Sequence, residues 1–156
     1  MENEKIERAL AVFKTLCKTL DDGEWPYEKN DEKLSISTSA RGDDLPMDIN
    51  IVVDAERQAI VLFSNLSFAI PEDKRLDFAI AISAINNLLV GGNFDFDISS
   101  GSLYFRMTNC FIDSEIGCGL FDYMMKASCF IIDDYNDKLL MLAKGLVSIE
   151  DFISKM

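Results

Sequence analysis

The chain opens with apolar residues that recur at three- and four-residue steps, as they do on one face of an amphipathic helix. The positions are Ile6, Leu10, Phe13, Leu16, Cys17 and Leu20. This spacing predicts a helix over residues 4–20 that packs one face on a core. Residues 21–33 are polar and contain Trp25-Pro26-Tyr27, so we expect a connecting loop held by two aromatic side chains.

The next segments alternate apolar and polar residues, which is typical of strands in an antiparallel sheet with one polar face. The alternating runs are residues 34–38, 47–51, 59–63, 94–98 and 103–108. A turn near residues 54–57 joins the second run to the third. A turn through residues 99–102 joins the last two runs into a hairpin.

Between these runs, residues 71–90 have the spacing of a second helix, with Pro71 and two acids in its first turn. One apolar stripe consists of Phe78, Ile82, Ile85 and Leu89. A second stripe, displaced around the axis, consists of Leu76, Ile80, Ala84 and Leu88. Because a helix with two apolar sides needs cover on both, we expect the second stripe to be a dimer or partner interface.

Residues 114–144 return to helical spacing. Ser114 is a candidate N-cap, but Gly117 and Gly119 weaken the first turns, so the helix is expected to break or to start late, near Leu120. The acidic run at residues 133–137 is expected on its solvated face. Ser148 with Asp151 predicts the start of a short last helix through residue 153.

The element order is thus α-β-β-β-α-β-β-α, which predicts an α+β fold: an antiparallel sheet with helices packed on it. The length of 156 residues suits a single domain, 1–156. The amino terminus lacks the pattern of a signal peptide, and no apolar run approaches membrane-spanning length. The four cysteines form no C-x-x-C pair. We therefore expect a cytoplasmic protein.

The net charge of −12 makes nucleic acid and anionic membranes poor partners. An acidic surface keeps a protein soluble, and it also attracts basic partners. The sequence contains no histidine, which removes the commonest general base. Asp95 and Asp97 would be neighbours on one strand face and could in principle form an acid–base pair or bind a cation. Their alternation with apolar residues already explains them as a solvated face, so we expect no catalytic, cofactor or metal site.

The chain resembles the YbjN family of candidate bacterial sensory transduction regulators, whose fold is similar to that of type III secretion chaperones. The resemblance rests on the order of elements over residues 4–155. It also rests on Ala84-Ile85-Asn86-Asn87, Gly92-Asn93-Phe94, the hairpin that follows, and Asp133, Asp134 and Tyr135 on the long helix. The glycine pair at the start of that helix departs from the expected pattern. The resemblance implies a homodimeric, non-enzymatic protein that binds other polypeptides or acts in regulation.

Three hypotheses follow. The first is a chaperone-like or regulatory homodimer that binds an unidentified protein or peptide. The second is an acidic immunity or inhibitor protein that neutralises a basic partner. The third is a carboxylate- or metal-dependent enzyme that uses Asp95 and Asp97.

Overall fold

A computed structural model describes residues 2–156 of the chain. Its helices are α1 (Glu2–Asp22), α2 (Arg75–Leu88), α3 (Cys118–Ala143) and α4 (Ile149–Ser154), and a short 3-10 turn, η1 (Glu72–Lys74), precedes α2. Its strands are β1 (Tyr27–Asn30), β2 (Ser35–Arg41), β3 (Pro46–Asp54), β4 (Ala59–Asn65), β5 (Asn93–Asp97) and β6 (Ser102–Cys110).

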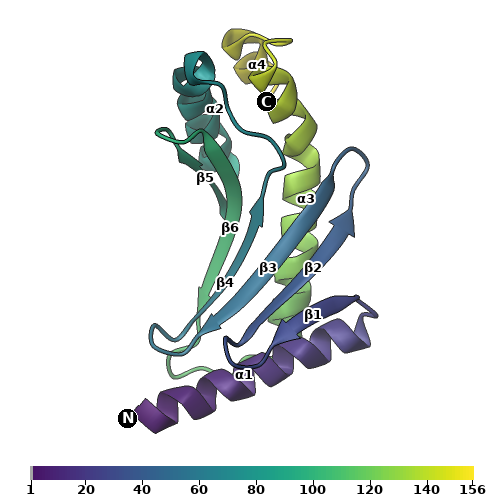
Figure 1. Ribbon diagram of the computed structural model, residues 1–156, viewed down its shortest axis with the longest axis vertical. Helices are drawn as coiled ribbons and strands as arrows, with labels where there is room; N and C mark the ends of the chain where they lie inside the picture. Colours follow the sequence, from purple (N-terminus) through teal and green to yellow (C-terminus); the bar gives the residue numbers. More distant parts are fainter. Residues whose placement is uncertain (1) are drawn as a thin grey trace.

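The six strands form one antiparallel sheet in the order β1-β2-β3-β4-β6-β5. Figure 1 shows α3 running along one face of the sheet and α1 crossing its lower end, with α2 and α4 side by side at the upper end. Every second residue of β3 from Met47 to Val53 is buried, and the residues between them are more open. The sheet therefore has one covered face and one wet face, and the predicted α+β fold is confirmed.

At its start, helix α1 packs a different face on the core than the sequence predicted. Ala9 and Val12 are buried, whereas Ile6 and Leu10 are exposed. Further along, Phe13, Leu16 and Leu20 are buried as expected. The reason is that the start of α1 faces the β3–β4 turn with its polar residues: Lys5 donates to the carbonyl of Glu56, and Arg8 donates to Gln58.

Strand β1 was not predicted. It pairs with β2, with Tyr27 opposite Thr38 and Asn30 opposite Ser35. Three of its four residues are exposed, so the sequence carries no alternation between buried and open positions. An edge strand that buries almost nothing is held by backbone hydrogen bonds, and these leave no mark on residue type.

The long helix begins at Cys118 with Gly117 as its N-cap, which confirms the late start and corrects the assignment of Ser114 as the cap. The hydroxyl of Ser114 instead donates to the carbonyl of Ile112, at 3.1 Å. The predicted cap of the last helix is confirmed, since the backbone N–H of Asp151 donates to Oγ of Ser148 at 3.1 Å.

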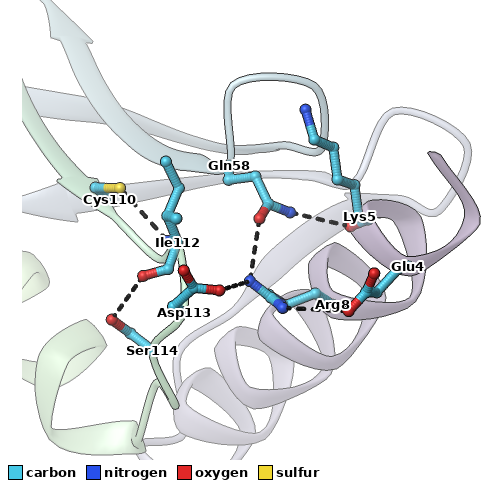
Figure 2. Close-up of polar contacts among 8 residues, drawn as sticks. All are labelled: Glu4, Lys5, Arg8, Gln58, Cys110, Ile112, Asp113 and Ser114. Carbon is cyan, nitrogen blue, oxygen red and sulfur yellow. Dashed lines mark hydrogen bonds and ion pairs between the residues drawn. The ribbon is translucent and has the colours of Figure 1, made fainter. Parts of the chain in front are cut away.

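A polar network fixes α1 to the lower end of the sheet (Figure 2). Nη1 of Arg8 donates to Oε1 of Gln58 at 3.3 Å and pairs with Oδ1 of Asp113 at 3.1 Å. Gln58, in the turn between β3 and β4, is buried and also accepts a backbone hydrogen bond from Phe111. The network ties three segments that are far apart in the sequence into one rigid corner.

Candidate protein-binding surfaces

The second apolar stripe of α2 lies largely on the surface of the chain. Leu76 is 73% exposed, Ile80 is 52% exposed and Leu88 is 56% exposed, and Ala84 between them is partly open. The first stripe does the core packing, since Phe78, Ile82 and Ile85 are buried. Exposed aliphatic side chains at this spacing form a continuous ridge along a helix.

The position of α2 is set by one amide side chain. Oδ1 of Asn86 accepts the backbone N–H of Phe94 at 2.8 Å, and its Nδ2 donates to the Phe94 carbonyl at 2.9 Å. Strand β5 is at the edge of the sheet, so Asn86 takes the place of a neighbouring strand at this point. Arg75, at the start of α2, donates to the carbonyls of Ile98 and Ser99 just beyond β5. Helix α2 is thereby held along the edge of the sheet with its second stripe facing outward.

The stripe is electrically balanced. Arg75 and Asp77 are the only charged residues in α2, so their charges cancel. Helix α4 packs beside α2 and carries the exposed Ile153, and Leu146 in the preceding loop is also exposed. This end of the molecule therefore presents apolar side chains from α2, from α4 and from the loop before α4, and the first turn of α4 adds the acids Glu150 and Asp151.

A second surface lies between α3 and the turn that joins β2 to β3. It is an open groove of about 500 Å³. Its apolar lining consists of Trp25, Pro26, Ala40, Met47, Cys129 and Phe130. Phe130 is 75% exposed, the most open aromatic residue of α3.

The turn beside this groove is fixed by a carboxylate from α3. The backbone N–H of Asp43 donates to Oδ1 of Asp133 at 3.0 Å and to Oδ2 at 3.2 Å. Gly42 lies so close that a Cβ atom added there would be 1.8 Å from Oδ1 of Asp133. The close approach needs a glycine at this position, and it makes the groove a pre-formed feature.

The acidic run 133–137 is only partly the solvated face that the sequence indicated. Asn136 is buried, and neither its Nδ2 nor its Oδ1 has a hydrogen-bond partner among the atoms of residues 2–156. Asp133 is half-buried against the turn. The helix therefore turns this run toward the β2–β3 turn and the end of β4, a placement that helical spacing alone could not reveal.

The thiol of Cys129 sits in the same groove. Burial, reinforced by the charge of Asp133, raises the pKa of this thiol. A raised pKa keeps the thiol protonated and weakly nucleophilic at neutral pH. Cys129 thus contributes apolar surface to the groove.

Asp95 and Asp97 do not form an acid–base pair. Oδ2 of Asp95 pairs with Nε of Arg106 at 2.8 Å. Hydrogen bonds from the Ser99 and Ser100 hydroxyls lower the pKa of Asp97 to about 2. Asp97 is thus held ionised by its own turn and is not poised to carry a proton near neutral pH.

Within residues 2–156, no group of three or more His, Cys, Asp or Glu side chains is arranged to hold a metal ion. The four cysteines, Cys17, Cys110, Cys118 and Cys129, are unpaired. None of the helices described is long and apolar enough to cross a membrane.

The chain has an α+β fold in which helices cover one face of an antiparallel sheet, and other solved structures share this fold. Its structure is similar to that of YbjN, a candidate transcription regulator from E. coli, with a TM-score of 0.58 and 15% identity over 81% of this chain and 92% of the other. A chain of the HopA1–SchA chaperone–effector complex aligns with a TM-score of 0.56 and 15% identity, covering 83% and 95% of the two chains. A chain of the ExsC–ExsE complex aligns with a TM-score of 0.53 and 14% identity over 81% and 91%.

These similarities confirm that the chain has the fold that the resemblance in sequence implied. No protein-family model matches the chain, and no curated protein matches it. The similar structures include a candidate regulator and members of named complexes, one of them a chaperone–effector pair. At this level of identity they show a shared fold.

The sequence indicated the α2 stripe but not the groove on α3. The groove brings together Trp25, Asp43 and Phe130, which lie on three segments far apart in the sequence. One signal was available: Phe130 falls outside the apolar stripe of its helix.

Proposed function

We propose that this protein is a non-enzymatic binding module for other polypeptides, chaperone-like or regulatory, and that it acts as a homodimer through the second stripe of α2. The observation that carries the proposal is the exposure of Leu76, Ile80 and Leu88 on a helix that is otherwise well packed. Full burial of one such side chain contributes roughly 1.5–3 kcal/mol. A stripe of this kind is more stable when covered.

A copy of the same chain suits the stripe because α2 has no net charge of its own. Two antiparallel copies of the helix could pack their stripes around a two-fold axis, so that each stripe covers the other. The balanced charges of α2 would add little repulsion at the contact, although the whole chain carries −12.

Binding of a further polypeptide is supported by the fold. Similar structures were determined in the HopA1–SchA chaperone–effector complex and in the ExsC–ExsE complex. We also propose a cytoplasmic location, which the unpaired cysteines support because reduced thiols are the rule there.

Sedimentation velocity over a range of concentrations tests the dimer. The wild type should sediment as a dimer, and Ile80→Asp should shift it to a monomer because a charge would be buried in the interface. Ile6→Asp is the matched control, since Ile6 is also an exposed isoleucine but lies on α1. A wild type that stays monomeric at all concentrations contradicts the dimer.

The second hypothesis, a protein that neutralises a basic partner, is supported by the net charge of −12. Affinity capture of interactors from a cell extract, repeated at low and high salt, separates it from the first. Strong loss of the complex at high salt favours the neutralising role, and salt-resistant capture favours apolar binding.

A further inference from the structure

The groove between α3 and the β2–β3 turn combines features that point to one kind of ligand. Its most open wall is the ring of Phe130, 75% exposed. The lining also includes Trp25 and Pro26 of the α1–β1 loop and the buried Met47. Aromatic side chains in a concave setting are the usual anchor points for a partner's large apolar residue.

The polar lining of the groove is predominantly acidic. Three carboxylates, those of Glu24, Asp43 and Asp133, face a single guanidinium, that of Arg41. Asp44 follows in the same turn, and desolvation and the charges of Asp137, Asp133 and Asp43 raise its pKa. The negative charges at this end of the groove are therefore not fully neutralised by the chain itself.

The acidic side of the groove is also held in place. Asp133 is bound by the backbone of Asp43, and Gly42 packs directly against it. A ligand that binds these carboxylates does not have to order the turn first, which lowers the entropic cost of binding.

A second copy of this chain is a poor occupant for the groove. Each copy carries a net charge of −12, so bringing another acidic surface against three carboxylates costs Coulomb energy. A basic segment gains from the same arrangement. Charge thus selects a partner for the groove different from the one that suits α2.

We propose that this groove binds a peptide segment of a partner protein in which a large apolar residue is flanked by Lys or Arg. The apolar side chain packs between Phe130 and Trp25, and the cationic side chains pair with Asp43 and Asp133. This assignment rests on the proposed function and specifies the chemistry of the polypeptide that the module binds.

The chain contains one tryptophan, Trp25, and it lines the groove. Its fluorescence therefore reports binding directly. The titration uses the full chain and three synthetic peptides: an apolar pair flanked by arginines, the same pair flanked by glutamates, and arginines flanking alanines. Only the first should bind, and its affinity should fall as salt is raised.

Two variants test the two halves of the groove. Phe130→Ser should weaken binding of the first peptide by about tenfold, the effect of losing a central aromatic contact. Asp43→Asn should weaken it by about threefold and flatten its salt dependence, as removal of a rim charge does. The backbone N–H of Asp43 makes the bond to Asp133, so this change leaves the turn in place.

Met141→Ser is the control for Phe130→Ser, since Met141 is an exposed apolar residue of α3. Glu7→Gln is the control for Asp43→Asn, since Glu7 is an exposed acid of α1. Neither should alter the titration. Circular dichroism of each variant checks that it is folded. Any of three results would overturn the assignment. The glutamate-flanked peptide could bind equally well, the first peptide could fail to bind, or Phe130→Ser could leave binding unchanged.

Failure of the groove and failure of the proposed function give different results. If the wild type forms a dimer and captures partners that Phe130→Ser still captures, the groove assignment is wrong and the binding module stands. If the wild type neither self-associates nor captures any protein, the proposed function itself is wrong.

Discussion

Two exposed apolar surfaces of this molecule differ in what surrounds them. The α2 stripe is a convex aliphatic ridge on a helix whose two charges cancel. The α3 groove is concave and aromatic, with three carboxylates against one guanidinium. Both can gain from apolar burial, but only the groove adds a strong electrostatic preference. The difference teaches that apolar exposure marks a contact surface, whereas the adjoining charges select its partner.

The two surfaces are also held in different ways. Asn86 fixes α2 to the edge of the sheet through two backbone hydrogen bonds. Asp133 fixes the turn beside the groove, again through a backbone N–H. Each surface therefore depends on one polar side chain that a substitution can remove, and the comparison can be tested one side at a time.

The largest effect is expected from placing two charges on the stripe. The double variant Leu76→Asp/Leu88→Asp should weaken self-association by more than about a hundredfold, because two carboxylates would have to be desolvated in each copy. Binding of the arginine-flanked peptide, followed by Trp25 fluorescence, should not change. Parallel loss of both activities would show that the stripe and the groove form one surface.

Next in size is the loss of the amide that holds α2. Asn86→Leu should lower the free energy of unfolding by about 2–3 kcal/mol, because it removes two hydrogen bonds and leaves the Phe94 backbone groups without a partner. Asn136→Leu is the contrasting change on α3. It should be neutral or stabilising, since the Asn136 amide is buried without a partner among residues 2–156. Urea unfolding of both variants measures this, and a large loss for Asn136→Leu would contradict it.

A smaller loss of stability is expected at the groove. Gly42→Ala should cost about 1–3 kcal/mol because its Cβ would meet the Asp133 carboxylate. The same change at Gly119, where nothing lies within 4 Å, should stabilise α3 by up to about 1 kcal/mol. Thermal unfolding of both variants measures the contrast. Equal effects at the two glycines would show that the contact between the turn and Asp133 is loose.

Most of the sheet could be predicted from the sequence, because alternation records which strand face is buried. The stripe could be predicted too, since helical spacing separates Leu76 and Ile80 from Phe78 and Ile82. Strand β1 could not, because its residues after Tyr27 are all exposed. The groove could not either, since Trp25 and Phe130 come to line the same groove only after α3 has packed along the sheet. The burial of Asn136 depends on how α3 is rotated about its axis. A polar amide side chain would by its type be expected on the solvent side of the helix.

The smallest expected effect concerns pH. The pKa of Asp97 is lowered to about 2 in the folded chain by the serine hydroxyls and the Ser99 N–H, below its unfolded value of about 4. A lowered folded pKa gives stability that is present above about pH 4 and is lost as pH falls toward about 2. The difference in unfolding free energy between the wild type and Asp97→Asn should therefore shrink over that range.

Urea unfolding at several pH values measures this difference, with Asp48→Asn as an exposed strand carboxylate for comparison. A difference that stays constant down to about pH 2 would show that the serine hydrogen bonds do not hold the charge. The change lies at the β5–β6 turn, whose residues do not line the groove, so peptide binding should not respond to it. A response of peptide binding would connect that turn to the groove.

The placement of Asn86 also bears on how this protein behaves at high concentration. Unpaired strand edges are where sheets of different molecules join and grow into fibrils. Asn86 occupies the backbone groups of Phe94 within the β5 edge, and the other edge strand, β1, is short and polar. Strand addition at β1 would bury little apolar surface, so we expect the chain to resist growth into fibrils at high concentration.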